Sequence, residues 1–372
     1  MLYALPDHEV MEQFLPGIGS RRLPVRAARA RLLSNPGLVP VAVDPTGGGA
    51  VYFADIGDAP LVEWKYIYTI ERLAGEGSIG ESFSTDLSIL DEPDVAGDSV
   101  EPHGLIFHVS RCGSTLFTKA LARSPANLTI SQGGPLQEGF WAVVTDDWQH
   151  PPEPDERSLR RLRNLVALMA RRRRPELERC FVKFISWNII YLDFIRAAFP
   201  RVPAVYLYRD PVEVIATVMQ ETTAVLRARG TPRAESLTGL PWRDTAAMDD
   251  AEYLARCYVH YFDIVERRGG EAGLGLVNFE QLRRPDCFPA VLARGLNLHP
   301  DSGELETMRA QYRFYSKDDS DSTPYSGEPE TLAEVLDEEQ RRVIVEITGE
   351  HLARLDRSAH NVFAPDADSV AV

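Results

Sequence analysis

The feature that most constrains the fold is an alternation of short apolar runs with longer segments of helical period. Strands are predicted at residues 105–109, 180–184, 204–208 and 275–279. Helices are predicted at residues 115–123, 159–173, 187–199, 211–229, 248–268 and 332–355. Strands that alternate with helices pair in parallel, because each helix carries the chain back to the same end of the sheet. The pattern therefore predicts an α/β fold whose central parallel sheet is covered by helices on both faces.

A polar stretch at residues 91–103 precedes this pattern and is predicted to be a linker. It divides the chain into a small α+β domain of unknown role at 1–98 and a larger domain at 99–372. In the first part, strands are predicted at 38–43 and 50–53 and a helix at 60–73. In the larger part, residues 231–250 are polar and rich in Pro, Gly and Thr, and they are long for a structureless connection. We interpret that segment as a lid.

Net charge limits the partners of the chain. Its 372 residues include 40 basic and 55 acidic side chains, a net charge of -15, which opposes unspecific binding to nucleic acid or to an anionic membrane surface. An anionic ligand would need a local basic pocket. The first residues contain no basic region before an apolar stretch, and no apolar run is long enough to span a membrane. We therefore expect a cytoplasmic protein with neither a nucleic-acid nor a membrane partner.

The cysteines support neither a disulfide framework nor a metal site. Cys112, Cys180, Cys257 and Cys287 are far apart and have no CxxC or Cys/His ligand spacing. Cys112 has no Arg six residues later, which a cysteine-phosphatase cradle would need, so it is predicted to be structural.

An anion-binding turn is predicted where the strand at 105–109 meets its helix. Residues 110–114 connect the two, and a turn at a helix N-terminus points several backbone N–H groups at one spot. Arg111 adds a guanidinium, and Ser114 and Thr115 add hydroxyls. The alternative interpretation is a helix capped by Ser or Thr. The turn lacks the GxxxxGK pattern of a Walker A loop.

Residues 111–116, Arg-Cys-Gly-Ser-Thr-Leu, resemble the 5'-phosphosulfate loop of the sulfotransferase superfamily, with Cys in place of the first Ser. Arg209 with the Asp-Pro that follows it, and the hydroxyl of Thr217, resemble the family's 3'-phosphate element. Lys183 is similar to the lysine that follows a central strand in the family, and residues 276–282 are similar to a family strand ending. The resemblance covers residues 104–317.

The resemblance implies a P-loop-type three-layer fold and transfer of a sulfuryl group from adenosine 3'-phosphate 5'-phosphosulfate (PAPS), without a metal. The acceptor would be a hydroxyl or amine of a small molecule or carbohydrate, and the product nucleotide would be the 3',5'-bisphosphate PAP. Catalytic roles are implied for Arg111 and Lys183, and Glu138 is the candidate base. The resemblance implies that the co-substrate is held by Arg111, Cys112, Gly113, Ser114, Thr115, Arg209 and Thr217 and, from a less specific match, by Arg313 and Lys317.

The chain departs from the family at the general base. Gln132 stands where many relatives carry the Glu of a Ser-Glu-Pro motif, and Ile185 stands where others carry a His. Glu138 is the nearest carboxylate, and its alternative interpretation is a charge at a helix N-terminus. His108 and His260 lie in apolar segments and are predicted to be core side chains.

Two other functions therefore stay open. One is a non-catalytic PAPS- or PAP-binding or regulatory protein, and the other is an ATP-dependent kinase on a related fold. The oligomeric state also stays open, with a homodimer as one option.

Overall fold

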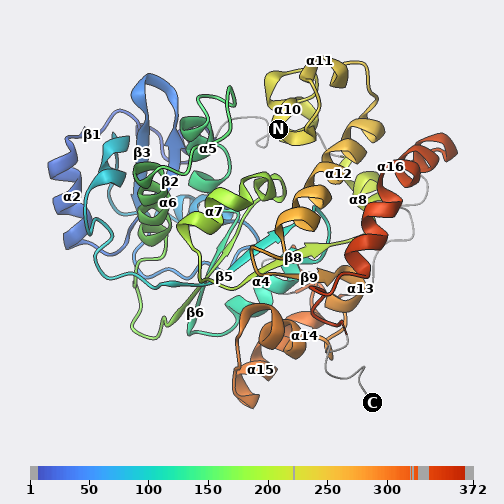
Figure 1. Ribbon diagram of the computed structural model, residues 1–372. Helices are drawn as coiled ribbons and strands as arrows, with labels where there is room; N and C mark the ends of the chain where they lie inside the picture. Colours follow the sequence, from blue (N-terminus) through green and yellow to red (C-terminus); the bar gives the residue numbers. More distant parts are fainter. Residues whose placement is uncertain (1–6, 221–222, 319, 321, 326–334, 365–372) are drawn as a thin grey trace.

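The central sheet of the computed structural model has the predicted parallel arrangement (Figure 1). The structure describes residues 7–220, 223–318, 320, 322–325 and 335–364. The sheet consists, in spatial order, of β6 (Asn127–Ser131), β7 (Arg179–Lys183), β5 (Pro102–His108), β8 (Ala204–Tyr208) and β9 (Leu274–Asn278). Every neighbouring pair is parallel. The predicted α/β fold class is confirmed.

Helices cover both faces of this sheet (Figure 1). One face carries α4 (Ser114–Ala122), α14 (Phe288–Ala290) and α15 (Ser302–Arg309), and the other carries α6 (Glu156–Met169), α7 (Leu192–Ala198) and α12 (Asp250–Arg268). Phe117 of α4 packs on Phe288 with ring centroids 5.8 Å apart, and Phe262 of α12 packs on Tyr206 of β8 at 6.5 Å. Right-handed crossovers explain why the helices are divided between the two faces. The chain crosses the sheet in one direction from β5 to β6, through α4, and in the opposite direction at each later step from β6 to β9. Helices of opposite crossing direction therefore lie on opposite faces.

β6 is a strand that the apolar pattern did not predict. Only two of its five residues are apolar, yet all five are buried. Its polar side chains find partners in neighbouring segments. Asn127 donates to the Leu121 carbonyl oxygen at 2.8 Å, and Thr129 donates to the Leu61 carbonyl oxygen at 3.3 Å. Such hydrogen bonds allow polar residues to be buried. A hydropathy pattern cannot predict these hydrogen bonds.

A second, mixed sheet belongs to the first part of the chain. Its spatial order is β1 (Arg22–Leu23), β4 (Ser82–Asp86), β3 (Ala50–Asp55) and β2 (Leu38–Asp44). β1 and β4 pair in parallel, and the other pairs are antiparallel. β2 and β3 lie where the sequence predicts strands. The predicted helix at 60–73 is α3 (Tyr66–Gly75), and α1 (Asp7–Phe14) and α2 (Val25–Ser34) also belong to this part.

The predicted linker at 91–103 is packed into the structure. Val95 and Val100 within it are buried, and both parts of the chain contribute to one hydrophobic cluster. Arg171, buried after α6, donates to the carbonyl oxygens of Asn35 and Leu38 at 2.9 and 3.1 Å. The division into two folding units at residue 98 stays a prediction, but the N-terminal sheet packs directly on the larger part.

The predicted lid at 231–250 contains two short helices, α10 (Pro232–Thr238) and α11 (Trp242–Thr245), and α10 packs on α12. The predicted helix at 211–229 is divided into α8 (Pro211–Val218) and α9 (Ala224–Arg227), and the one at 187–199 begins with the 3-10 helix Ser186–Tyr191. Further helices are α5 (Gly139–Val144), α13 (Phe279–Leu282) and α16 (Glu338–Asp356). The first residues of the predicted helix at 332–355 lie outside the described residues. Within the described ranges, no helix combines the length and apolar character needed to cross a membrane.

Candidate functional site

The turn between β5 and α4 has an unusual backbone. Arg111 and Gly113 take left-handed angles, with φ of 57° and 78°. Non-glycine residues avoid this region, so the surroundings must hold Arg111 in it. The N-cap of α4 is Gly113, which offers no side-chain cap. The alternative of a helix capped by Ser or Thr is therefore not what the structure shows, and the turn keeps the geometry expected of an anion site.

The side chains of the turn differ in their burial. Cys112 is fully buried, and burial raises the pKa of its thiol to about 12. The thiol therefore stays protonated at neutral pH, which fits the structural role predicted for it. Ser114 is buried, and Thr115 is half-buried at the start of α4. A Cβ on Gly113 would lie 3.1 Å from the Phe279 ring, so a side chain there would push against the helix that follows β9.

Lys183 is the last residue of β7, and its amine has no polar partner in the described part of the chain. Its side chain is almost fully buried, and its Nζ atom has no hydrogen-bond partner among the described residues. Burial is the main reason why the pKa of Lys183 falls to about 7; Cys112 opposes this fall, and the charges of Lys65 and Lys317 add smaller effects in the same direction as burial. Parallel neighbours β5 and β7 end at the same edge of the sheet, so Lys183 and the turn at 110–113 share that edge.

All four lysines of the chain gather around this edge. The sequence has 40 Lys and Arg residues, and the lysines are Lys65, Lys119, Lys183 and Lys317. The Nζ atoms of Lys65 and Lys317 lie 4.8 and 5.1 Å from the ring centroid of Trp64, and both charges act on Lys183. Lys119 donates to the carbonyl oxygen of Asp318, the residue after Lys317, at 2.8 Å. This edge of the sheet therefore gathers the basic side chains of Lys65, Lys183 and Lys317.

Arg209 follows β8 and reaches the turn. Its Nη1 donates to the carbonyl oxygen of Arg111 at 3.2 Å, its guanidinium lies 4.2 Å from the ring centroid of Phe279, and only 7% of the residue is exposed. The Nε atom pairs with the Glu213 carboxylate at 2.5 Å. Thr217, one turn further along α8, donates to the Glu213 carbonyl oxygen at 3.0 Å. The loop at 111–116 and the Arg209 element, the two phosphate-binding elements of the resemblance, are therefore in contact. Glu213 contacts both Arg209 and Thr217.

Arg313 and Lys317 are the two basic residues predicted to hold the co-substrate near the end of the resemblance. The structure places Lys317 where its charge acts on Lys183. Arg313 is 72% exposed at its side chain and pairs with Glu306 at 3.6 Å. Lys65 comes from the first part of the chain, and no motif in the sequence pointed to it.

Gln132 stands next to Lys183 in a strained backbone conformation. Its φ is 48°, and its backbone N–H donates to the Lys183 carbonyl oxygen at 2.8 Å. Its side-chain Nε2 lies 3.4 Å from His108 Nε2, and its Oε1 is buried without a partner in the described residues. His108 Nδ1 lies 2.7 Å from the Val109 carbonyl oxygen. Burial and the charge of Lys183 lower the His108 pKa to about 3, so this ring is neutral and buried, as a core residue should be.

Glu138 precedes α5 and pairs with an arginine of the predicted lid. Its Oε1 lies 3.1 Å from Nη1 of Arg233. The Arg233 guanidinium in turn lies 4.4 and 4.5 Å from the ring centroids of Trp148 and Trp187. Trp187 is four residues beyond Lys183, so Arg233 connects Glu138 to the segment that follows β7. Glu138 is also the N-cap residue of α5, which agrees with the alternative interpretation of a charge at a helix N-terminus, although its side chain makes no capping hydrogen bond.

No protein-family model and no curated protein matches the chain. The solved structures that are similar to it include three sulfotransferases. A sulfotransferase from Alicyclobacillus acidocaldarius is 15% identical, with a TM-score of 0.41, and the match covers 73% of this chain and 98% of that one. A sulfotransferase from Mycobacterium avium is 12% identical, with a TM-score of 0.44 and coverage of 90% and 97%. The sulfotransferase domain from the curacin biosynthetic pathway is 14% identical, with a TM-score of 0.34 and coverage of 67% and 99%. At this similarity, what the site does has to be inferred from its own residues.

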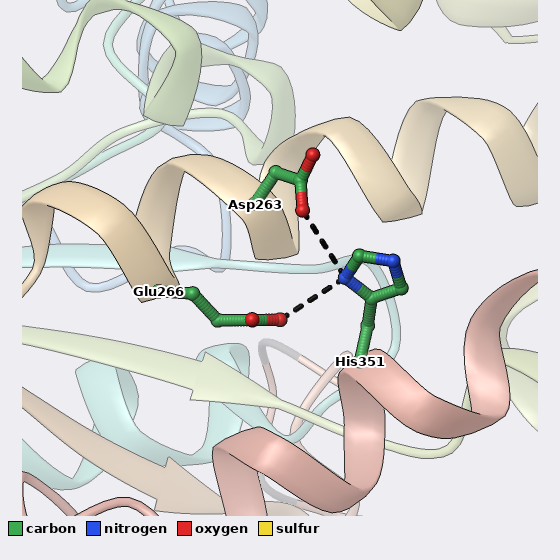
Figure 2. Close-up of side chains that lie close together, drawn as sticks. All are labelled: Asp263, Glu266 and His351. Atoms are coloured by element: carbon green, nitrogen blue, oxygen red, sulfur yellow. Dashed lines mark hydrogen bonds and ion pairs between the residues drawn. The ribbon is translucent and has the colours of Figure 1, made fainter.

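A second cluster of titratable side chains joins α12 to α16 (Figure 2). His351 Nδ1 lies 3.2 Å from Asp263 Oδ1 and 3.0 Å from Glu266 Oε1. These ligand-type atoms are within 4.8 Å of one another, a spacing that could hold a metal ion. However, Arg354 Nε lies 2.5 Å from Glu266 Oε2, and its Nη2 lies 2.8 Å from His351 Nδ1. Because Arg354 already pairs with Glu266 and lies against His351, we interpret the cluster as a polar clamp between the two helices.

Proposed function

We propose that this chain is a sulfotransferase that moves a sulfuryl group from PAPS to a hydroxyl or amine of an acceptor. The observation that carries the proposal is the buried Nζ atom of Lys183, which has no partner among the described residues. It stands at the sheet edge where the turn at 110–113 and Arg209 meet. A buried amine pays a large desolvation cost when it is charged, and an anion bound at this edge would offset that cost. The positions of the four lysines around this edge of the sheet also support a negatively charged ligand.

The residues fit a ligand with an anionic group at each end. Arg111 and the backbone of the turn would hold the 5'-phosphosulfate, and Arg209 with Thr217 would hold the 3'-phosphate. The Glu213 carboxylate now pairs with Arg209, so the 3'-phosphate would have to replace it. When bound, PAPS supplies a sulfuryl group attached to a phosphate that is a good leaving group.

Lys183 is proposed to stabilise the charge that develops during transfer. The bond from the acceptor atom to sulfur forms while the bond from sulfur to the phosphate oxygen breaks, and negative charge develops on that oxygen. A nearby anion raises the pKa of Lys183 from about 7, which keeps the ammonium protonated when it is needed. The acceptor proton passes to a base. We propose Glu138 for this role, because Gln132 has no basic group and Arg233 holds the Glu138 carboxylate in place at 3.1 Å.

The second candidate is a PAP-binding protein without turnover. It is favoured by Gln132, whose amide oxygen is buried without a partner in the described residues at the position next to Lys183. An amide there can accept a hydrogen bond but cannot take a proton. The kinase alternative would need a lysine inside the turn, and residues 110–114 contain none.

Calorimetry with PAP in the presence of EDTA, compared with Mg-ATP, tests the nucleotide. We expect PAP to bind without metal and more tightly than Mg-ATP. Arg209→Ala is expected to weaken PAP binding by about 2 kcal/mol, since a phosphate loses a charged partner. Arg342→Ala serves as the control, because Arg342 is exposed and pairs only with neighbours on α16. Equal affinity of Arg209→Ala and the parent chain would refute the assignment.

Incubation with sulfur-35-labelled PAPS and a panel of acceptors then separates the two candidates. Labelled acceptor indicates a sulfotransferase, and PAP binding without labelled product over the panel favours the binding protein.

A further inference from the structure

We propose that the hollow beside Trp64 is the acceptor site and that it takes a neutral, polyhydroxylated ligand such as a short sugar chain. The hollow has a volume of about 670 Å³ and is lined mainly by Val62, Glu63, Trp64, Tyr68, Glu71 and Arg72. This volume is in the range of small-molecule sites. The proposal rests on the function proposed above and names the class of its acceptor.

An aromatic pair forms one wall of the hollow. The Trp64 and Tyr68 rings have centroids 4.9 Å apart and are tilted by 49°. Both residues are half-buried, so each presents part of a ring to the hollow. Aromatic rings combine an apolar face with a polar tip. Such a wall suits a sugar, whose ring has C–H groups on its faces and hydroxyls around its rim.

The charges around the hollow favour a neutral ligand. Lys65 and Lys317 already lie over the Trp64 ring at 4.8 and 5.1 Å, and they would repel a cation placed there. Glu71 lines the same hollow and has no ion-pair partner in the described part of the chain, and it would repel an anion. A carboxylate accepts hydrogen bonds from hydroxyl groups without any net charge on the ligand.

A second carboxylate is fixed in the wall of the hollow. Glu63 is buried, and Arg72 Nε lies 2.6 Å from its Oε1. The hydroxyl of Thr69 donates to the other oxygen of Glu63. These contacts hold the arginine and the carboxylate rigidly, so the wall offers fixed polar groups to a ligand, while the Glu71 carboxylate stays available to accept from a hydroxyl.

Two lysines connect the hollow to the proposed transfer site. Lys65 and Lys317 contact Trp64 on one side, and their charges act on Lys183 on the other. A sugar on Trp64 would therefore lie beside the two lysines whose charges act on Lys183. All the lining residues except Ser320 come from the first part of the chain, so the proposal gives residues 1–98 the larger share of acceptor binding.

Direct binding of three neutral trisaccharides tests the proposal. Cellotriose, maltotriose and triacetylchitotriose are each titrated into the full chain with PAP present, and binding is followed by saturation-transfer NMR and tryptophan fluorescence. We expect at least one of them to bind. Trp64→Ala and Glu71→Gln are expected to weaken it at least tenfold, and Glu71→Gln is expected to leave PAP affinity unchanged. Trp242→Ala and Glu346→Gln are the matched controls, and both should bind the sugar like the parent chain.

The outcomes separate this proposal from the function on which it rests. If PAP binds and the chain sulfates 2-naphthol or p-nitrophenol while none of the three sugars binds, the sugar site is overturned and the sulfotransferase stands. Sugar binding that persists in Trp64→Ala also overturns the site. If PAP does not bind, the proposed function fails. A sugar that then still binds and is lost in Trp64→Ala would support the hollow as a sugar site.

Discussion

Replacing Lys183 by Met is expected to stabilise the unliganded protein while it removes PAP binding. The pKa of Lys183 is about 7 in the folded chain, against 10.5 for an ordinary lysine, chiefly because the amine is buried. Between these values the unfolded chain binds a proton that the folded chain does not. The free energy of unfolding therefore rises with pH through this range. Below the folded-state pKa both states are protonated, and Lys183 contributes no further change.

The size of the effect follows from the shift. One pKa unit corresponds to about 1.4 kcal/mol, so at pH 7 the buried amine lowers the free energy of unfolding by up to about 4 kcal/mol. Between pH 7 and pH 9 roughly 2 kcal/mol of this should be regained. Methionine is of similar length and carries no charge, so the variant should be more stable at pH 7 and should lack the pH-dependent part.

Urea unfolding followed by tryptophan fluorescence at pH 7, 8 and 9 measures both proteins. The difference between them removes the contribution of the cysteine thiols, which ionise in the unfolded chain from about pH 8.5. We expect the stability advantage of Lys183→Met to shrink by about 2 kcal/mol from pH 7 to pH 9. Two parallel pH curves, or a Met variant less stable than its parent at pH 7, would refute the reasoning. Proton uptake when PAP binds at pH 8, measured by calorimetry in buffers of different ionisation enthalpy, is expected only in the parent chain.

Three further predictions concern single residues. Glu213→Gln should tighten PAP binding several-fold in calorimetry, because Arg209 loses a competing carboxylate at 2.5 Å; weaker binding would show that Glu213 orients Arg209. Gly113→Ala should lower the free energy of unfolding by about 1–2 kcal/mol, since its φ is 78° and the Phe279 ring is 3.1 Å from the new Cβ. Gly77→Ala, with a similar φ but open space around it, should cost less, and equal costs would exclude the clash. Glu266→Gln should lower the free energy of unfolding by about 1 kcal/mol or less, because the clamp of Figure 2 is partly exposed. The measurement is the melting temperature, which should fall slightly, and an unchanged temperature would remove the clamp from the stabilising contacts.

The central sheet could be predicted wherever its strands are apolar. The bounds of four strands, β5, β7, β8 and β9, differ from the predicted bounds by three residues or fewer. These strands could be predicted because strands buried on both faces consist of continuous runs of apolar residues. β6 was not predicted, because Asn127 and Thr129 are polar residues that are buried through hydrogen bonds to carbonyl oxygens outside the strand. Helix starts were harder to predict, as the late beginning of α3 at Tyr66 shows.

The candidate site divides in the same way. Arg111, Lys183 and Arg209 could be singled out because each ends a strand of one parallel sheet, and parallel strands bring their carboxyl ends to one edge. Lys65 and Trp64 could not, because they lie just before α3 in the first part of the chain and are brought towards that edge only by packing. The pairing of Glu213 with Arg209, and of Arg233 with Glu138, likewise depends on side-chain contacts that no spacing encodes.

The sequence by itself therefore determined a parallel α/β sheet and a basic edge at the ends of its strands, because hydrophobic period and strand endings are local properties. Only the tertiary structure decided that the Lys183 amine is buried without a polar partner among the described residues, that the charges of Lys65 and Lys317 act on it, and that the first part of the chain lines most of a hollow beside Trp64. Those features depend on which distant segments share a contact, and desolvation and Coulomb energy act through that contact rather than along the chain.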